Sequence, residues 1–176
     1  METREFAERV LFSTSLEEKL TSVRELTDHE PGAVLGVPGE PGRPVDLRLR
    51  KDGVRAGFPG DSKLLDEEQR GVLLHFFANH ELLATELMAL VLLKFPEAPA
   101  DFRRGIVQTL KEEQLHTKWY LRRMEECGVR FGDFPLNRFF WDCIAPMETP
   151  LDYVTRLSLT FEQANLDYAH HYARIL

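Results

Sequence analysis

The sequence predicts an all-α protein, a helical bundle with one long crossover. Three long segments, at about 66–94, 100–127 and 151–176, carry apolar residues at helical spacing. The first two are joined by a short link, whereas more than 20 residues separate the second from the third. A short link joins antiparallel neighbours, and a long crossover lets two successive helices run parallel.

Composition and charge limit the classes of function. A chain of 176 residues with 43% hydrophobic and 29% charged residues is ordinary for a soluble domain with a core. The net charge of −7 argues against a general nucleic-acid binder, which needs a basic surface. The longest apolar run, LLATELMALVLLKF, is interrupted by Glu86, and the N-terminus lacks the apolar region of a signal peptide. We therefore expect a cytoplasmic protein that does not enter membranes.

Residues 1–65 are expected to form an N-terminal helix and a Pro/Gly-rich arm packed on the bundle. SLEEKLTSVRELT, residues 15–27, predicts a short amphipathic helix opened by a capping box of Ser15 and Glu18. Eight of the fourteen residues in 31–44 are Pro or Gly, so neither helix nor strand can persist there. VDLRLR, which follows, alternates apolar and polar residues and predicts a short extended segment.

Residues 66–176 are expected to form the bundle itself. Asp66 and Gln69 make a capping box that opens a helix running to about Lys94, just before a proline. A second helix fits from about Ala100 to Cys127. It ends at Gly128, because glycine accepts the left-handed conformation after a helix.

The crossover and the third long helix complete the predicted bundle. GVRFGDFPLNRFFWDCIAPMETP has room for one short helix at about 136–144, and the third long helix begins after Pro150. An antiparallel pair followed by a long crossover is the connectivity of a ferritin-like bundle. The sequence ends at Leu176 without residues for a fourth core helix.

Each long helix places one carboxylate in the middle of its apolar face: Glu81, Glu113 and Glu162. On the second helix this face also carries His116, three residues after Glu113. A buried carboxylate costs several kcal/mol unless it is paired, hydrogen-bonded or bound to a cation. Three such carboxylates on three helices are difficult to explain as surface charge.

The Glu-x-x-His pair of Glu113 and His116 points two ligands toward one metal centre. Such pairs also occur by chance, and a Glu–His hydrogen bond at a half-exposed position is the alternative. Four-helix bundles hold iron or manganese pairs with one Glu from each of two helices and Glu-x-x-His from each of the others. Glu81, the pair, and then Glu162 follow this order, and the second Glu-x-x-His is missing. We therefore predict a dinuclear iron or manganese site with these four residues as ligands.

Other polar residues near the predicted site have supporting roles. We expect His75 and His80 to be packed in the core or to hydrogen-bond a ligand, and Tyr120 to be a core residue or a hydrogen-bond donor beside the metal. Glu86 and Glu112 lie off the apolar faces, and are expected to be solvated or paired along a helix surface.

Several motifs resemble those of one known family, the ferritin-like proteins grouped as domain of unknown function 455. The resemblance covers most of the chain from about residue 41. It rests on PGRP (41–44), HFFANHELLATEL (75–87), KEEQLHTKWYLRRMEECGVRFGDFP (111–135) and FEQANLDYA (161–169).

The resemblance implies a dinuclear-metal bundle with Glu81, Glu113, His116 and Glu162 at ligand positions. It also implies a further helix with another Glu-x-x-His, which this sequence lacks. Three explanations stay open: the sequence is a fragment, the natural chain is short, or a homodimer or other partner chain completes the bundle.

Three functions are compatible with these features. The first is an oxidoreductase that uses dinuclear iron or manganese to activate O₂ and oxidise a small organic substrate. The second is a ferritin-type protein that handles metal, and the third is a metal-free helical interaction module. The oxidoreductase ranks first, because storage needs a closed shell that nothing in the sequence indicates.

Overall fold

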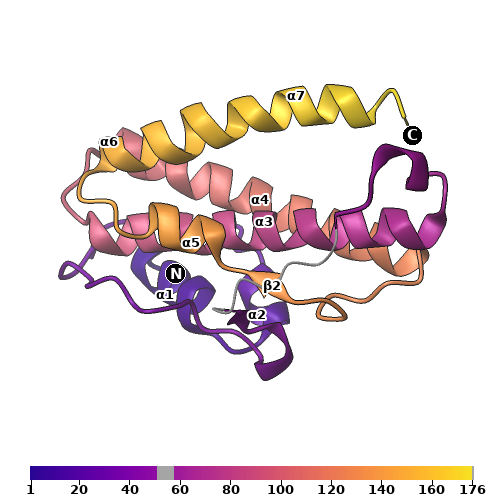
Figure 1. The fold of residues 1–176 in the computed structure, drawn as a ribbon. Helices are drawn as coiled ribbons and strands as arrows, with labels where there is room; N and C mark the ends of the chain where they lie inside the picture. The colour runs from indigo at the N-terminus through magenta and orange to yellow at the C-terminus, as the bar shows by residue number, and fades with distance from the viewer. Residues whose placement is uncertain (51–57, 176) are drawn as a thin grey trace.

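The computed structural model describes residues 1–50 and 58–175, and only the backbone at 158, 160–165 and 167. It confirms an all-α helical bundle. Helices α3 (Glu67–Lys94) and α4 (Ala100–Glu126) form a long antiparallel pair (Figure 1). The last long helical segment joins α6 (Pro150–Tyr153), the π-helix η3 (Val154–Phe161) and α7 (Glu162–Tyr172), and runs parallel to α4 across the predicted crossover.

The ends of α3 and α4 follow from local signals. The Asp66 carboxylate accepts hydrogen bonds from the backbone N–H groups of Glu68 and Gln69, at 2.8 and 3.3 Å. After α4, Gly128 adopts a positive φ of 78° and its N–H donates to the carbonyl of Glu125. Both predicted boundaries are confirmed to within one residue.

The crossover contains a strand as well as the predicted short helix. Strand β2 (Leu136–Asn137) pairs in parallel with β1 (Leu49–Arg50), and α5 (Phe139–Ile144) follows. Ahead of β1, the 3₁₀ turn η1 (Val45–Leu47) occupies half of the predicted extended segment. This small sheet ties the N-terminal arm to the crossover.

The N-terminal prediction is partly wrong. An unpredicted helix, α1 (Thr3–Phe12), buries Phe6 and Val10 at helical spacing and packs against α3. The predicted helix at 15–27 survives only as α2 (Leu16–Leu20), with Ser15 as its N-cap. The chain then extends so that Thr27 forms a parallel bridge with Glu2. This tertiary pairing overrides the helical propensity of the remaining residues.

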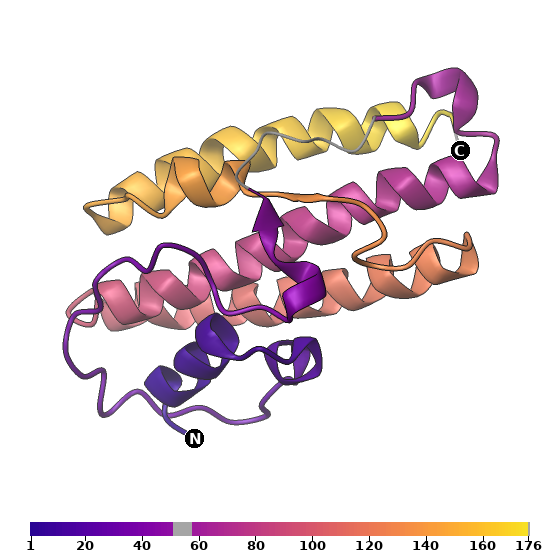
Figure 2. The ribbon, with the colours of Figure 1, turned by 60° about the horizontal axis from the view of Figure 1, so that its bottom comes forward.

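Helix α3 is the central element of the bundle. Helices α1 and α2 lie on one side of the α3/α4 pair, and the last long helical segment lies on the other (Figures 1 and 2). Among the described helices, α3 alone is long and apolar enough to cross a membrane. However, 78% of its most apolar window is buried inside the protein, as in the core helix of a soluble protein. The last helix ends beside η2 (Asp61–Lys63), where His171 Nε2 lies 3.1 Å from Asp61 Oδ2.

The prediction that Glu86 is solvated or paired along a helix surface is wrong, because its side chain is fully buried. The carboxylate accepts hydrogen bonds from Arg43 Nε at 3.0 Å and from Arg43 Nη2 at 2.7 Å. Lys19 Nζ lies 3.1 Å from Glu86 Oε1. Because an unpaired charge could not be buried without a large penalty, these two cations explain why an acidic residue interrupts the apolar run.

Arg43 belongs to the PGRP motif, and its neighbours hold the motif in place. The Gly42 N–H donates to the carbonyl of Leu11 at 2.9 Å, and a Cβ at this position would overlap the carbonyl of Phe12. Arg43 Nη1 also donates to Asn79 Oδ1 at 3.0 Å. The motif therefore anchors the arm to both α1 and α3.

Candidate metal centre

Three of the four predicted ligands converge between α3 and α4. One ligand atom from each of Glu81, Glu113 and His116 lies within 4.8 Å of the others. His116 Nδ1 is 3.1 Å from Glu113 Oε2 and 3.8 Å from Glu81 Oε2. Within the described side chains, this is the one group of three or more acidic, histidine or cysteine residues that could hold a metal ion.

The helix pair itself brings these groups together. Glu113 and His116 are one turn apart on α4 and so point the same way, and α3 runs antiparallel alongside with Glu81 in its middle. Each glutamate has a threonine four residues later whose hydroxyl donates to the carbonyl of that glutamate. The distances are 2.9 Å for Thr85 to Glu81 and 2.8 Å for Thr117 to Glu113. The backbone carbonyls of the two glutamates are therefore bonded in the same way.

The electrostatics of Glu113 favour a bound cation. Its side chain is only 9% exposed, yet in the described part of the chain no lysine or arginine nitrogen comes within 4 Å of it. Glu86, in contrast, has both Lys19 and Arg43. Among the described side chains, the Glu113 carboxylate is hydrogen-bonded to the His116 imidazole, and a Glu81 oxygen within 4.8 Å adds a second negative charge. A divalent cation would neutralise both carboxylates, so this donor set fits a metal ion.

One side of the centre is open to solvent. The His116 side chain is 43% exposed, compared with 17% for Glu81. The Trp119 ring lies 5.5 Å from the His116 ring and is 59% exposed. A small molecule could therefore approach the centre from the His116 side.

Tyr120 borders the same centre. Burial, and to a smaller extent the charges of Glu81 and Glu113, together raise the pKa of Tyr120 to about 12. Its ring packs 5.9 Å from that of Phe77. The phenol therefore stays protonated at neutral pH and can donate a hydrogen bond.

Glu162, the fourth predicted ligand, is not among the described side chains. Its backbone begins α7, directly after the π-helix η3. Its role as a ligand therefore stays a prediction.

His75 and His80 are packed against aromatic rings. The His75 ring lies 5.4 and 5.3 Å from those of Phe131 and Phe134, and His75 Nε2 accepts a hydrogen bond from the Gly132 N–H at 3.1 Å. The His80 ring stacks on that of Phe140 at 4.3 Å. Burial lowers the pKa of each histidine to about 4, so both are neutral at physiological pH.

The sequence analysis did not predict the buried cluster of Lys19, Arg43 and Glu86. Two features of the sequence are nevertheless consistent with it. PGRP places a charged residue among rigid and small ones, and Glu86 interrupts the most apolar run. Pairing them required knowing that the arm crosses α3.

A helical bundle with a candidate Glu/Glu/His cation site is the class of protein that the fold and this geometry define. The chain belongs to the family described as Protein of unknown function (DUF455), which matches residues 3–176. No curated protein matches the chain, and neither does any solved structure.

Proposed function

We propose that this protein binds iron or manganese through Glu81, Glu113 and His116 and is a non-haem oxidoreductase that uses O₂ to oxidise a small organic substrate. The observation that supports the proposal is the convergence of these three donors within 4.8 Å in the middle of a helix pair. Carboxylate oxygens and a neutral imidazole suit iron and manganese. Three protein ligands also leave coordination positions for small molecules.

The proposal extends to a dinuclear centre in a ferritin-like bundle. Glu162 would then supply a further carboxylate from the last helical segment, and a homodimer or another partner chain would supply the missing ligands. The metal would contribute Lewis-acid and one-electron chemistry. We place the protein in the cytoplasm, with no nucleic acid or membrane among its partners.

The residues around the metal have distinct roles in this proposal. Glu81 and Glu113 bind and neutralise the cation, and His116 supplies the neutral donor on the open side. Tyr120 remains protonated and donates a hydrogen bond near the reacting atoms. The half-buried rings of Phe77 and Tyr120 pack together and would limit the access of water beside Tyr120.

A metal-free interaction module is the second candidate, and the Glu113 to His116 hydrogen bond of 3.1 Å favours it. That bond already satisfies part of the hydrogen-bonding capacity of the buried Glu113 carboxylate. The two functions differ in whether the protein reacts with O₂.

The test is anaerobic loading with Fe(II), followed by exposure to O₂ while absorbance and O₂ consumption are recorded. Wild-type protein is expected to consume O₂ and develop an iron-dependent absorption band. Glu113→Gln is expected to lose both, whereas Glu112→Gln, at an exposed neighbouring position, keeps both. Identical traces for wild type and Glu113→Gln would contradict the proposed function.

A further inference from the structure

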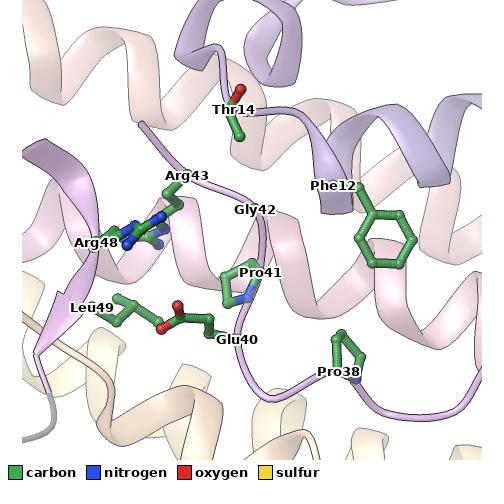
Figure 3. A pocket seen from close by; sticks show the side chains of 9 residues that line it. All are labelled: Phe12, Thr14, Pro38, Glu40, Pro41, Gly42, Arg43, Arg48 and Leu49. Carbon is green, nitrogen blue, oxygen red and sulfur yellow. The ribbon is translucent and has the colours of Figure 1, made fainter. Parts of the chain in front are cut away.

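A second candidate site lies in the N-terminal arm and shares no residue with the candidate metal centre. It is a pocket of about 300 Å³ between the end of α1, the loop before PGRP, and strand β1 (Figure 3). This volume is at the lower end for small-molecule sites and suits a ligand about the size of one substituted ring. The metal proposal does not explain this pocket.

The pocket combines apolar walls with two arginines. Phe12, Pro38 and Leu49 contribute apolar surface, and Arg48 contributes an exposed guanidinium group. The Arg43 side chain also lines the pocket, but it is only 1% exposed and its guanidinium is bonded to Glu86 and Asn79. In Figure 3 the two arginines lie toward one end of the pocket and the rings of Phe12 and Pro38 toward the other. The pocket is therefore amphipathic.

The wall formed by Arg43 belongs to a buried cluster with excess positive charge. Lys19, Arg43 and Glu86 are each no more than 4% exposed. Lys19 Nζ lies near three acceptors: Glu86 Oε1 at 3.1 Å and two backbone carbonyls of α1, at 2.5 and 3.2 Å. Three acceptors match the three N–H groups of a charged ammonium. Burial lowers the pKa of Lys19, and the charge of Glu86 and a hydrogen bond to it act in the opposite direction. With Lys19 protonated, two cations and one carboxylate carry a formal charge of +1, which a nearby anion would stabilise.

Arg48 adds a second positive charge that is available to a ligand. It is exposed, and no acidic side chain of the described residues lies within 4 Å of it. Glu40 is the acidic residue of the pocket, and it is exposed. The charge of Glu40 also acts on Arg138, whose pKa is raised mainly by a hydrogen bond to Asp142 and to a smaller extent by Glu40. The formal charge of the pocket lining is therefore +1 in a protein whose net charge is −7.

We propose that this pocket binds a small organic anion. Its carboxylate or phosphate group would face the exposed guanidinium of Arg48, with the buried charge of Arg43 behind it, and its apolar body would pack against Phe12 and the neighbouring prolines. A guanidinium group such as that of Arg48 recognises both head groups through paired N–H donors. Both requirements, a negative head and an apolar body, follow from the opposite ends of the same pocket.

The test is titration of the full chain by isothermal calorimetry and NMR with four probes at constant ionic strength. Benzoate and phenyl phosphate carry both features, inorganic phosphate has only the charge, and benzyl alcohol has only the ring. At least one aromatic anion is expected to bind at least about tenfold more tightly than the single-feature probes, and the tighter of the two identifies the head group. Failure of both aromatic anions to bind at about 10 mM, or equal binding of the alcohol, would overturn the proposal.

Substitutions of exposed residues test the site without endangering the fold. Arg48→Gln is expected to weaken binding of the preferred anion by about tenfold or more, because it removes a charged donor. Glu40→Gln should strengthen binding, because it removes the like charge from the pocket. Arg50→Gln is the control, since Arg50 is exposed two residues after Arg48, in β1, but does not line the pocket. Equal affinities of wild type and Arg48→Gln, or equal losses in Arg48→Gln and Arg50→Gln, would refute the assignment.

Discussion

Replacing Glu113 with Gln should change stability in opposite directions without and with metal. A Glu81 and a Glu113 oxygen lie within 4.8 Å of each other. Two unit charges at that distance repel by about 3 kcal/mol at an effective dielectric constant of about 20. Glu81 is 17% exposed, so water screens part of this repulsion. We expect the metal-free Glu113→Gln protein to be more stable than wild type by about 1–3 kcal/mol, which raises Tm by about 2–12 °C.

With metal present the order should reverse. An ion at about 1,000 times its Kd stabilises the native wild type by about 4.1 kcal/mol, which exceeds the advantage of the metal-free variant. The Gln side chain is a neutral and weaker ligand, so the variant gains less. Differential scanning calorimetry at pH 8, which favours neutral imidazole, measures both states after chelation and after addition of Mn(II). Glu112→Gln serves as the control and should change neither the stability of the metal-free protein nor its stabilisation by Mn(II).

Two results would refute this reasoning. Destabilisation of the metal-free Glu113→Gln protein by more than about 1 kcal/mol would mean that the protein itself already compensates the Glu113 charge. Equal stabilisation of wild type and variant by Mn(II) would mean that Glu113 does not bind the ion.

Three other predictions concern the fold. Glu86→Ala leaves two buried cations without their carboxylate and should destabilise the protein by about 3–5 kcal/mol in urea titrations. The control Glu112→Ala should have little effect. Equal losses of stability in the two variants would contradict the buried pairing. The pKa of His75 is about 4 in the folded protein, against 6.5 for an unperturbed histidine, so the unfolded state binds more protons between these values. The free energy of unfolding is therefore expected to fall by about 3 kcal/mol as the pH falls from 6.5 toward 4. Urea titrations at several pH values should show that the free energy of unfolding depends less on pH in His75→Phe than in wild type. Gly42→Ala should detach the arm and speed its cleavage in limited proteolysis, whereas Gly39→Ala, with open space around its Cβ, should not.

Local signals made the long helices predictable. Asp66 caps α3 through its own side chain, and Gly128 ends α4 through its own backbone conformation. The prediction for residues 15–27 failed because Thr27 pairs with Glu2, a contact between segments that propensity does not describe. The ends of the long helices follow from neighbouring residues and could be predicted. The absence of helix after Leu20 follows from pairing with a distant segment and could not.

The same distinction holds for the buried polar groups. Glu113 and His116 are three residues apart on one helix, and an antiparallel neighbour made the approach of Glu81 predictable. Glu86 was misassigned because its partners, Lys19 and Arg43, are 67 and 43 residues away in sequence. Helical spacing reveals which side chains share a face, but not which distant segment covers that face.

The most direct test of the central claim is the metal content of the purified protein. Wild type, Glu113→Gln and Glu112→Gln should be incubated with Fe(II) or Mn(II), freed of loosely bound ions, and analysed by elemental mass spectrometry. The structure predicts at least one ion per chain in wild type and Glu112→Gln, and a large loss in Glu113→Gln. Metal content near zero in wild type, or equal content in all three proteins, would contradict a metal centre at Glu81, Glu113 and His116.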